Sequence, residues 1–304
     1  MRGIFLTGSF LLLAVLLCGG CKDGGRSSKT PQEQVTIALK IEDPVDRFKK
    51  LVDISEEFRK LSDSTGAKEC LRHATEAADA IDIDRLAAER TRAHIDLAGA
   101  QNDNGDRRGC KDAYERAEVA LKQVEDVASK TEYLVDLALL KIKIGEESDA
   151  GRDLKDAETA SEEINDSQFR VEMLGWMTIA YKRLENAEEA ERMMQLAKAV
   201  ADSQEKTSEK ARRLSQVARE QIKSLDDKEA GMKTFLEAVE VGRSVDDSDY
   251  QRASTLVAIA KDYVEVKQID KAQELLDEAQ KIALGKSALG PVLKEIDEVR
   301  RSYN

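Results

Sequence analysis

Residues 256–279, with the sequence LVAIAKDYVEVKQIDKAQELLDEA, decide the fold of this chain. The first half carries a bulky, an aliphatic and a small residue at offsets of 0, 3 and 4, ending at Ala260. The second half carries a small, a large and a small residue at offsets of 0, 4 and 7, ending at Ala279. Each set of offsets marks one face of an α-helix. The stretch therefore predicts two helices joined by a short loop, with alanines where the helix axes approach closely.

Both signatures recur along the chain with a nearly constant period. The small residues of the first lie 43, 40, 42, 38 and 42 residues apart, and the final alanines of the second lie 43, 40, 40, 41 and 41 apart. The bulky residues that open the first signature are Leu51, His94, Leu134, Trp176, Leu214 and Leu256. One such pair of helices cannot bury its apolar face alone, whereas a stack of pairs can. We therefore expect an all-α protein, a right-handed α-solenoid of about six helix-turn-helix repeats over residues 41–286, with a period of about 41.

Turn and capping residues support these boundaries. Asp43 followed by Pro44 is typical of a helix start, and Gly285 and Pro291 follow the last repeat. We expect residues 287–304 to form a C-terminal helix that caps the open end of the array. The N-caps expected for the later first helices are Asp84, Ser129, Ser167, Ser208 and Asp249.

Composition agrees with this architecture and excludes several classes of protein. Charged residues make up 36% of the chain and aromatic residues 4%, and there are only three prolines, so little interrupts a helix. A β-sandwich or parallel-sheet enzyme would need more Val, Ile and aromatic runs. The formal net charge of −12 argues against nucleic-acid binding, which requires neutralised phosphates. The same charge would be repelled by an anionic membrane surface.

The first residues are typical of an export signal. A short basic start precedes an apolar run over residues 4–17, which is too short to span a bilayer, so residues 1–20 are expected to be a signal peptide. Gly19-Gly20-Cys21 resembles the lipobox of bacterial lipoproteins, although Cys18 stands where Leu is usual. The resemblance implies lipidation of Cys21 and a location at the cell membrane or in the periplasm. Plain secretion and an uncleaved anchor are the alternatives. Residues 21–40 are expected to hold the lipidated Cys and a flexible tether.

The repeat anchors resemble those of tetratricopeptide repeats. The repeat ending at Ala279 matches this family best, Trp176 occupies the usual Trp position, and Gly105 and Gly145 occupy that of the loop glycine. Two features differ, because these units exceed the family's 34 residues and lack the closing proline. The resemblance covers about residues 42–286, and it implies a protein or peptide partner held by the inner faces of the first helices.

Carried over to this sequence, the resemblance places a binding groove in the third and fourth repeats. All the residues concerned are apolar or aromatic, whereas the equivalent positions of the flanking repeats are mixed. The alternative is that the longer helices bury these residues against each other. The expected groove residues are Val135, Leu139, Ile142, Met177, Tyr181 and Leu184.

No motif in the sequence points to catalysis, a cofactor or a metal. The chain has two histidines, His73 and His94, both expected to be structural, and it lacks metalloprotease, nucleophile-elbow and phosphate-loop patterns. Cys70 and Cys110 are expected to be separate thiols, with a disulfide as the alternative. We therefore expect a non-enzymatic protein- or peptide-binding scaffold tethered to the cell envelope. A self-assembling envelope component and an accessory subunit of an enzyme complex are the alternatives.

Overall fold

The computed structural model describes residues 29–303, and all regular secondary structure in that range is helical. Six consecutive helix pairs form the body of the protein, which confirms the predicted all-α repeat architecture. None of the helices in this range is long and apolar enough to cross a bilayer. The pairs are α2 (Pro44–Lys60) with α3 (Ser64–Asp79), α4 (Ala87–Asp103) with α5 (Arg107–Leu121), α6 (Val127–Ile144) with α7 (Glu147–Ser161), α8 (Ser167–Arg183) with α9 (Ala187–Asp202), α10 (Thr207–Lys223) with α11 (Lys228–Arg243), and α12 (Asp249–Glu265) with α13 (Ile269–Ala283).

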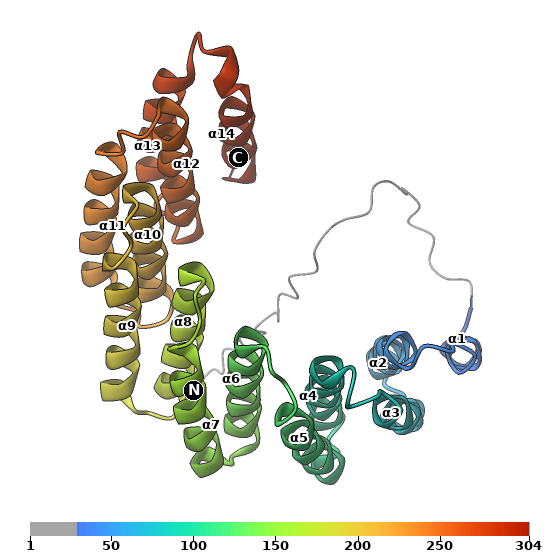
Figure 1. Ribbon diagram of the computed structural model, residues 1–304. Helices are drawn as coiled ribbons and strands as arrows, with labels where there is room; N and C mark the ends of the chain where they lie inside the picture. Colours follow the sequence, from blue (N-terminus) through green and yellow to red (C-terminus); the bar gives the residue numbers. More distant parts are fainter. Residues whose placement is uncertain (1–28, 304) are drawn as a thin grey trace, which may run out of the picture.

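The six pairs follow one another along an open crescent (Figure 1). The first helices α2, α4, α6, α8, α10 and α12 line the inner side of the curve, and their partners lie on the outer side. Each first helix also packs against the first helix of the next pair. The inner side of the crescent is therefore built from six similar helices laid side by side.

The closing alanines of the second signature occupy the helix crossings that the sequence predicted. All six are buried, with at most 1% of their surface exposed. A methyl group at each crossing allows the close approach of two helix axes, and larger side chains of the opposite helix fill the remaining space. One such side chain is Phe235, which stacks on Tyr263 of the next pair with 4.1 Å between the ring centres.

In α6, α8, α10 and α12 the N-cap lies one to three residues before the cap expected from the sequence. In α6 the backbone N–H of Ser129 donates to the carboxylate of Asp126 at 2.8 Å, so Asp126 is the N-cap and Ser129 lies inside the helix. Ser167, Ser208 and Asp249 likewise lie inside α8, α10 and α12. In α6 and α8 the N-cap is an aspartate, whose charge also faces the positive end of the helix dipole. Ser248 caps α12 through its hydroxyl, and the N-cap of α10 makes no side-chain hydrogen bond.

Two further expectations on caps have different outcomes. Asp43 caps α2 by accepting the backbone N–H of Asp46 at 2.9 Å, as predicted. Asp84, however, lies in the turn before α4, whose N-cap is Leu86 and has no side-chain hydrogen bond. The start of α4 is therefore set by packing rather than by a capping side chain.

The fourth repeat has a different register from the one that the sequence signature indicated. Trp176 is 44% exposed, whereas Leu174, Met177 and Thr178 are almost completely buried. The inward-facing set of α8 is therefore Leu174, Met177 and Thr178, two residues before the set that begins at Trp176. The small residue is a threonine here, and its hydroxyl donates to the Leu174 carbonyl at 2.8 Å, which satisfies it in an apolar position. With this register, the bulky residues of repeats two to five are spaced by 40 residues throughout.

Short helices cover both ends of the array. Helix α1 (Pro31–Ala38) occupies the end of the stretch expected to be a flexible tether, begins with a capping box at Thr30, and buries Gln34 against α2. The Gln34 side chain donates to Glu57 at 2.8 Å. The signal peptide and Cys21 lie outside the described residues.

The C-terminal cap is formed as predicted. A 3₁₀ turn, Ser287–Leu289, leads into α14 (Gly290–Tyr303), which packs against α12 and α13. Its buried residues are Val292, Ile296 and Val299. The apolar face of the last helix pair is thus covered by the chain itself.

Candidate binding face

The six residues predicted to line an apolar groove do not form one. Val135, Met177 and Tyr181 are at most 3% exposed and Leu139 is 8% exposed, so these four belong to the core. Ile142 and Leu184 are half-buried and pack against the same core. The predicted groove is therefore wrong, and the alternative, burial between longer helices, is correct.

Two physical reasons account for this error. In α8 the register differs by two residues, which turns Met177 and Tyr181 from the inner side of the crescent into the core. In α6 the register is as expected, but successive first helices pack closely enough to bury Val135 and Leu139 between them. A side chain buried in this way cannot contact a partner.

Residues two positions before and two positions after the buried bulky residue of each first helix are at least partly exposed, except for the buried Gln216. We call them the −2 and +2 positions, and the surface that they form the inner face. From the first repeat to the sixth, the −2 positions are Lys49, Arg92, Glu132, Glu172, Arg212 and Ser254, and the +2 positions are Asp53, Asp96, Asp136, Trp176, Gln216 and Ala258.

Between α4 and α6 the inner face is held by one arginine and two carboxylates. Arg92 donates to Asp136 at 2.6 Å and to Glu132, and its guanidinium lies over the Tyr133 ring, 4.8 Å from the ring centre. Burial raises the pKa of Asp136, and the charge of Arg92 opposes that rise. The −2 residue of one repeat thus neutralises the −2 and +2 residues of the next.

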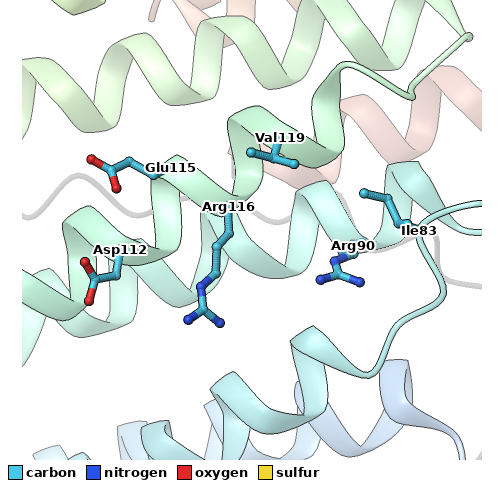
Figure 2. Close-up of a pocket in the computed structure, with 6 residues that line it drawn as sticks. All are labelled: Ile83, Arg90, Asp112, Glu115, Arg116 and Val119. Carbon is cyan, nitrogen blue, oxygen red and sulfur yellow. The ribbon is translucent and has the colours of Figure 1, made fainter.

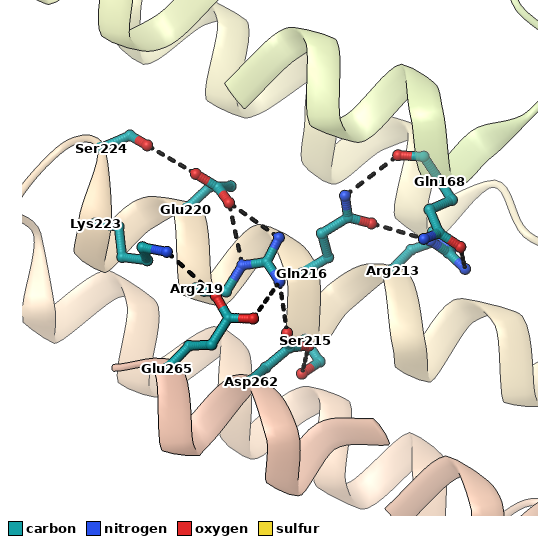
Figure 3. A network of polar contacts seen from close by, with 10 residues as sticks. All are labelled: Gln168, Arg213, Ser215, Gln216, Arg219, Glu220, Lys223, Ser224, Asp262 and Glu265. Atoms are coloured by element: carbon teal, nitrogen blue, oxygen red, sulfur yellow. Dashed lines mark hydrogen bonds and ion pairs between the residues drawn. The ribbon is translucent and has the colours of Figure 1, made fainter. Parts of the chain in front are cut away.

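Between α10 and α12 the cation that joins two first helices is Arg219, which lies about two turns beyond the −2 position of α10 (Figure 3). Its guanidinium lies 2.9 Å from Asp262 and 3.1 Å from Glu220, and Asp262 also accepts a hydrogen bond of 2.6 Å from the Ser215 hydroxyl. Burial raises the pKa of Asp262, and Arg219 opposes the rise. Lys223 pairs with Glu265 at the edge of this network.

Hydrogen bonds to uncharged oxygen acceptors join α8 to α10. The Gln216 amide donates to the backbone carbonyl of Gln168 at 3.2 Å, and Arg213 bridges the side chains of both glutamines. Figure 3 shows this cluster beside the Arg219 network, so the two form one continuous polar strip on the inner face.

Among residues 29–303, no ion pair joins α6 to α8. The −2 residues are Glu132 and Glu172, and among residues 29–303 Glu172 has no ion-pair partner. Partial burial raises the pKa of Glu132, and the Asp136 and Glu172 carboxylates add to the rise against the charge of Arg92. Burial likewise raises the pKa of Glu172, while Arg219 and a hydrogen bond from the Trp176 indole oppose it.

Trp176 is the single tryptophan of the chain and stands at the +2 position of α8. We call the junction between two neighbouring first helices a step, so Trp176 belongs to the α6/α8 step. It is 44% exposed, although tryptophan is a residue that folding usually covers. Asp96 is the +2 residue of α4, which lies on the opposite side of α6 from α8. Its pKa is raised to about 6 by burial within the curve and by the neighbouring Asp136. The middle of the inner face therefore combines an exposed aromatic ring with carboxylates that the chain itself does not fully neutralise.

The chain also has an open pocket of about 310 Å³ beside α5 (Figure 2). Arg90 and Arg116 extend into it from α4 and α5, but Arg116 pairs with Asp79, and Arg90 donates to the backbone carbonyl of Ile81 at 2.8 Å. The buried His94 lies 3.5 Å from Asp79, and burial lowers its pKa to about 4. These groups are occupied in joining the first two repeats.

The remaining candidate groups for chemistry are buried. Cys70 and Cys110 are free thiols, and burial raises their pKa values to about 12 and about 11, far from what a nucleophile needs at neutral pH. Within residues 29–303 no three His, Cys, Asp or Glu side chains are grouped so as to hold a metal ion. The inner face is thus the surface on which a function can be argued.

Searches with protein-family models and against curated proteins give no match. Solved helical-repeat structures are similar in outline. BtubC (BKLC) from P. vanneervenii is 16% identical with a TM-score of 0.39, covering 84% of this chain and 91% of that one. Ton1535 from Thermococcus onnurineus NA1 is 13% identical with a TM-score of 0.38, covering 87% and 94%. A tetratricopeptide repeat protein from Parabacteroides merdae ATCC 43184 is 15% identical with a TM-score of 0.33, covering 82% and 98%. Likeness at this level says nothing about a ligand or partner.

Proposed function

We propose that this protein is a non-enzymatic scaffold that binds a protein or peptide on the inner face of its crescent. The observation that carries the proposal is the α6/α8 step, where Trp176 is exposed and, among residues 29–303, no ion pair joins Glu132 to Glu172 or to any other residue of α8, since Glu132 pairs with Arg92 of α4. An exposed tryptophan surrounded by charged groups is typical of an interface hot spot. The flanking steps are closed within the chain, α4/α6 by ion pairs and α8/α10 by hydrogen bonds, so they need no partner.

The covered ends of the array favour binding over self-assembly. Helix α14 packs on α12 and α13, and α1 packs on α2, so neither end presents a bare helix pair to a second copy. An end-to-end filament would have to displace one of these helices. The inner face, in contrast, is open along its length.

A photo-crosslinking amino acid tests where the partner binds. We expect the full-length chain carrying it at position 176 to form crosslinks in the cells that produce the protein. The matched control places it at Leu236, which is 57% exposed on α11 of the outer side. Crosslinks to another protein at 176 and not at 236 support the proposal. Equal crosslinking at both positions, or crosslinking only to a second copy of the chain, contradicts it.

We further propose that the scaffold is tethered to the cell envelope through lipid on Cys21. The support is the apolar run followed by Gly19-Gly20-Cys21, and each buried methylene of an acyl chain contributes about 0.8 kcal/mol to membrane binding. Cys21→Ala is expected to leave the membrane fraction, whereas Cys18→Ala stays in it. The reverse result would assign the lipid to Cys18 instead.

A further inference from the structure

Among the described residues, the α6/α8 step of the inner face lacks a cation like the arginine that joins the two helices of the α4/α6 step. At the α4/α6 step, the −2 residue Arg92 reaches two carboxylates of the next repeat, Glu132 and Asp136. At the α6/α8 step, the equivalent −2 residue is Glu132, which faces Glu172. The −2 positions of successive repeats are equivalent, so the place from which Arg92 reaches two acids in one step is held by an acid in the next.

The chain itself shows how a cation is bound in this setting. Arg92 contacts carboxylates and also lies over the ring of Tyr133, 4.8 Å from its centre. Trp176 presents a larger aromatic face at the next step, and its exposed surface is open to the inner side. A cation is attracted more strongly to the face of a tryptophan ring than to that of other aromatic rings.

The carboxylates near Trp176 favour a positively charged ligand. Burial raises the pKa of Glu132, Asp136 and Glu172, and the Glu172 carboxylate adds to the rise at Glu132. An incoming positive charge would stabilise the ionised forms of these carboxylates, whereas a neutral or acidic side chain would not. The net charge of −12 favours the approach of a basic partner over the whole surface.

From these observations we propose that the α6/α8 step binds an arginine or lysine side chain of a basic partner peptide, seated against Trp176 and between the carboxylates of Glu132 and Glu172. The inference rests on the proposed binding function and specifies the chemistry of its partner. Arginine fits better than lysine, because its planar guanidinium can stack on the indole and pair with a carboxylate at the same time. The contact is electrostatic and therefore weakens as ionic strength rises.

The single tryptophan provides a direct readout, since all indole fluorescence comes from the proposed site. The full-length chain is titrated with a short capped peptide of alanines around one central arginine, and with the same peptide carrying norleucine at that place. We expect a saturable change in Trp176 emission with arginine, a weaker one with lysine and none with norleucine. Equal responses to arginine and norleucine, or no saturable response to arginine, would overturn the inference.

Charge-matched variants separate a local site from general attraction. Glu132→Gln combined with Glu172→Gln is expected to weaken binding of the arginine peptide at least about 10-fold. Glu229→Gln combined with Glu240→Gln removes the same charge from exposed positions of α11 and should change binding less than about 2-fold. Equal weakening by both pairs would show that only net charge matters and would reject the site.

The two proposals can fail separately. Crosslinking to a partner at position 176 without a response to the arginine peptide would leave the scaffold in place and reject the basic side chain as its ligand. An arginine response that is lost in Glu132→Gln with Glu172→Gln, but no crosslinked partner at position 176, would keep the cation site and reject the peptide-binding scaffold.

Discussion

The α10/α12 step and the α6/α8 step of the inner face differ in whether charges join the two first helices. In the first, Arg219 lies among Asp262, Glu220 and Glu265, so the charges of two repeats close on each other. In the second, within the part of the chain that the structure describes, no ion pair joins Glu132 of α6 to Glu172 of α8 beside the exposed Trp176, and Glu132 pairs with Arg92 of α4 instead. The core residues behind both steps are nearly interchangeable, whereas the surface residues are not. The repeat therefore constrains one face of each helix and leaves the other free to differ.

The largest expected effect tests whether Trp176 belongs to the surface at all. Leu174→Ala should lower the free energy of unfolding by about 2–5 kcal/mol, because Leu174 is 1% exposed and its removal leaves a cavity. Trp176→Ala should cost less than about 1 kcal/mol, since the ring packs only on one side. Urea unfolding followed by circular dichroism measures both. A larger loss for Trp176→Ala would place the tryptophan in the core and remove the comparison.

The second largest expected effect concerns the α10/α12 step, which is held by Arg219. Arg219→Ala leaves Asp262 and Glu220 without their cation in a poorly hydrated place, so we expect a loss of about 2–3 kcal/mol in the free energy of unfolding. Lys223→Ala is the control, because Lys223 pairs with Glu265 in an exposed position, where a salt bridge contributes less than about 1 kcal/mol. If both variants lose the same small amount, the α10/α12 step is not held by its charges.

A third variant turns a closed step into an open one. Arg92→Ala removes the cation between α4 and α6 and leaves Glu132 and Asp136 facing each other. The expected loss is about 1 kcal/mol, less than for Arg219→Ala because Arg92 is more exposed. Arg92→Lys keeps the charge and should recover part of the loss, and chemical denaturation of the three proteins side by side measures it. No difference between Ala and Lys would mean that the guanidinium acts through packing alone.

The smallest expected effect is a dependence of stability on pH that comes from Asp96 on the inner face. The pKa of Asp96 is about 6 in the folded chain and about 3.9 when unfolded, so protonation favours the folded state. The stability contributed by this group is fully present below about pH 4 and is lost as the pH rises through 6.

Asp96→Asn is therefore expected to be more stable than the parent chain at pH 7 and no more stable at pH 4. Although the surrounding helices of the crescent partly desolvate Asp96, its side chain still reaches solvent, and screening keeps the gain below about 1 kcal/mol. Thermal melts of both proteins at the two pH values measure the difference. A variant that is less stable at pH 7 would show that Asp96 is held by a favourable contact rather than by repulsion.

Much of the fold followed from local pattern. The closing alanines, the cap at Asp43 and the helix after Pro291 were predicted because each depends on residues within one or two turns. The proposed groove was not, because a small residue at Ala180 and a bulky one at Trp176 satisfied the signature as well as Thr178 and Leu174 do. A 40-residue spacing kept through repeats two to five would have indicated the correct register.

The sequence by itself determined that the chain forms paired helices with a repeat of about 41 residues, because helix faces and capping residues are written in offsets of three, four and seven. Only the tertiary structure decided which way α8 is rotated, that Val135 and Leu139 are buried between neighbouring first helices, and that Glu132 faces Glu172. Residues that meet on the inner face lie about 40 positions apart, so their contacts depend on the rotation and spacing of whole helices. No local pattern records these two quantities.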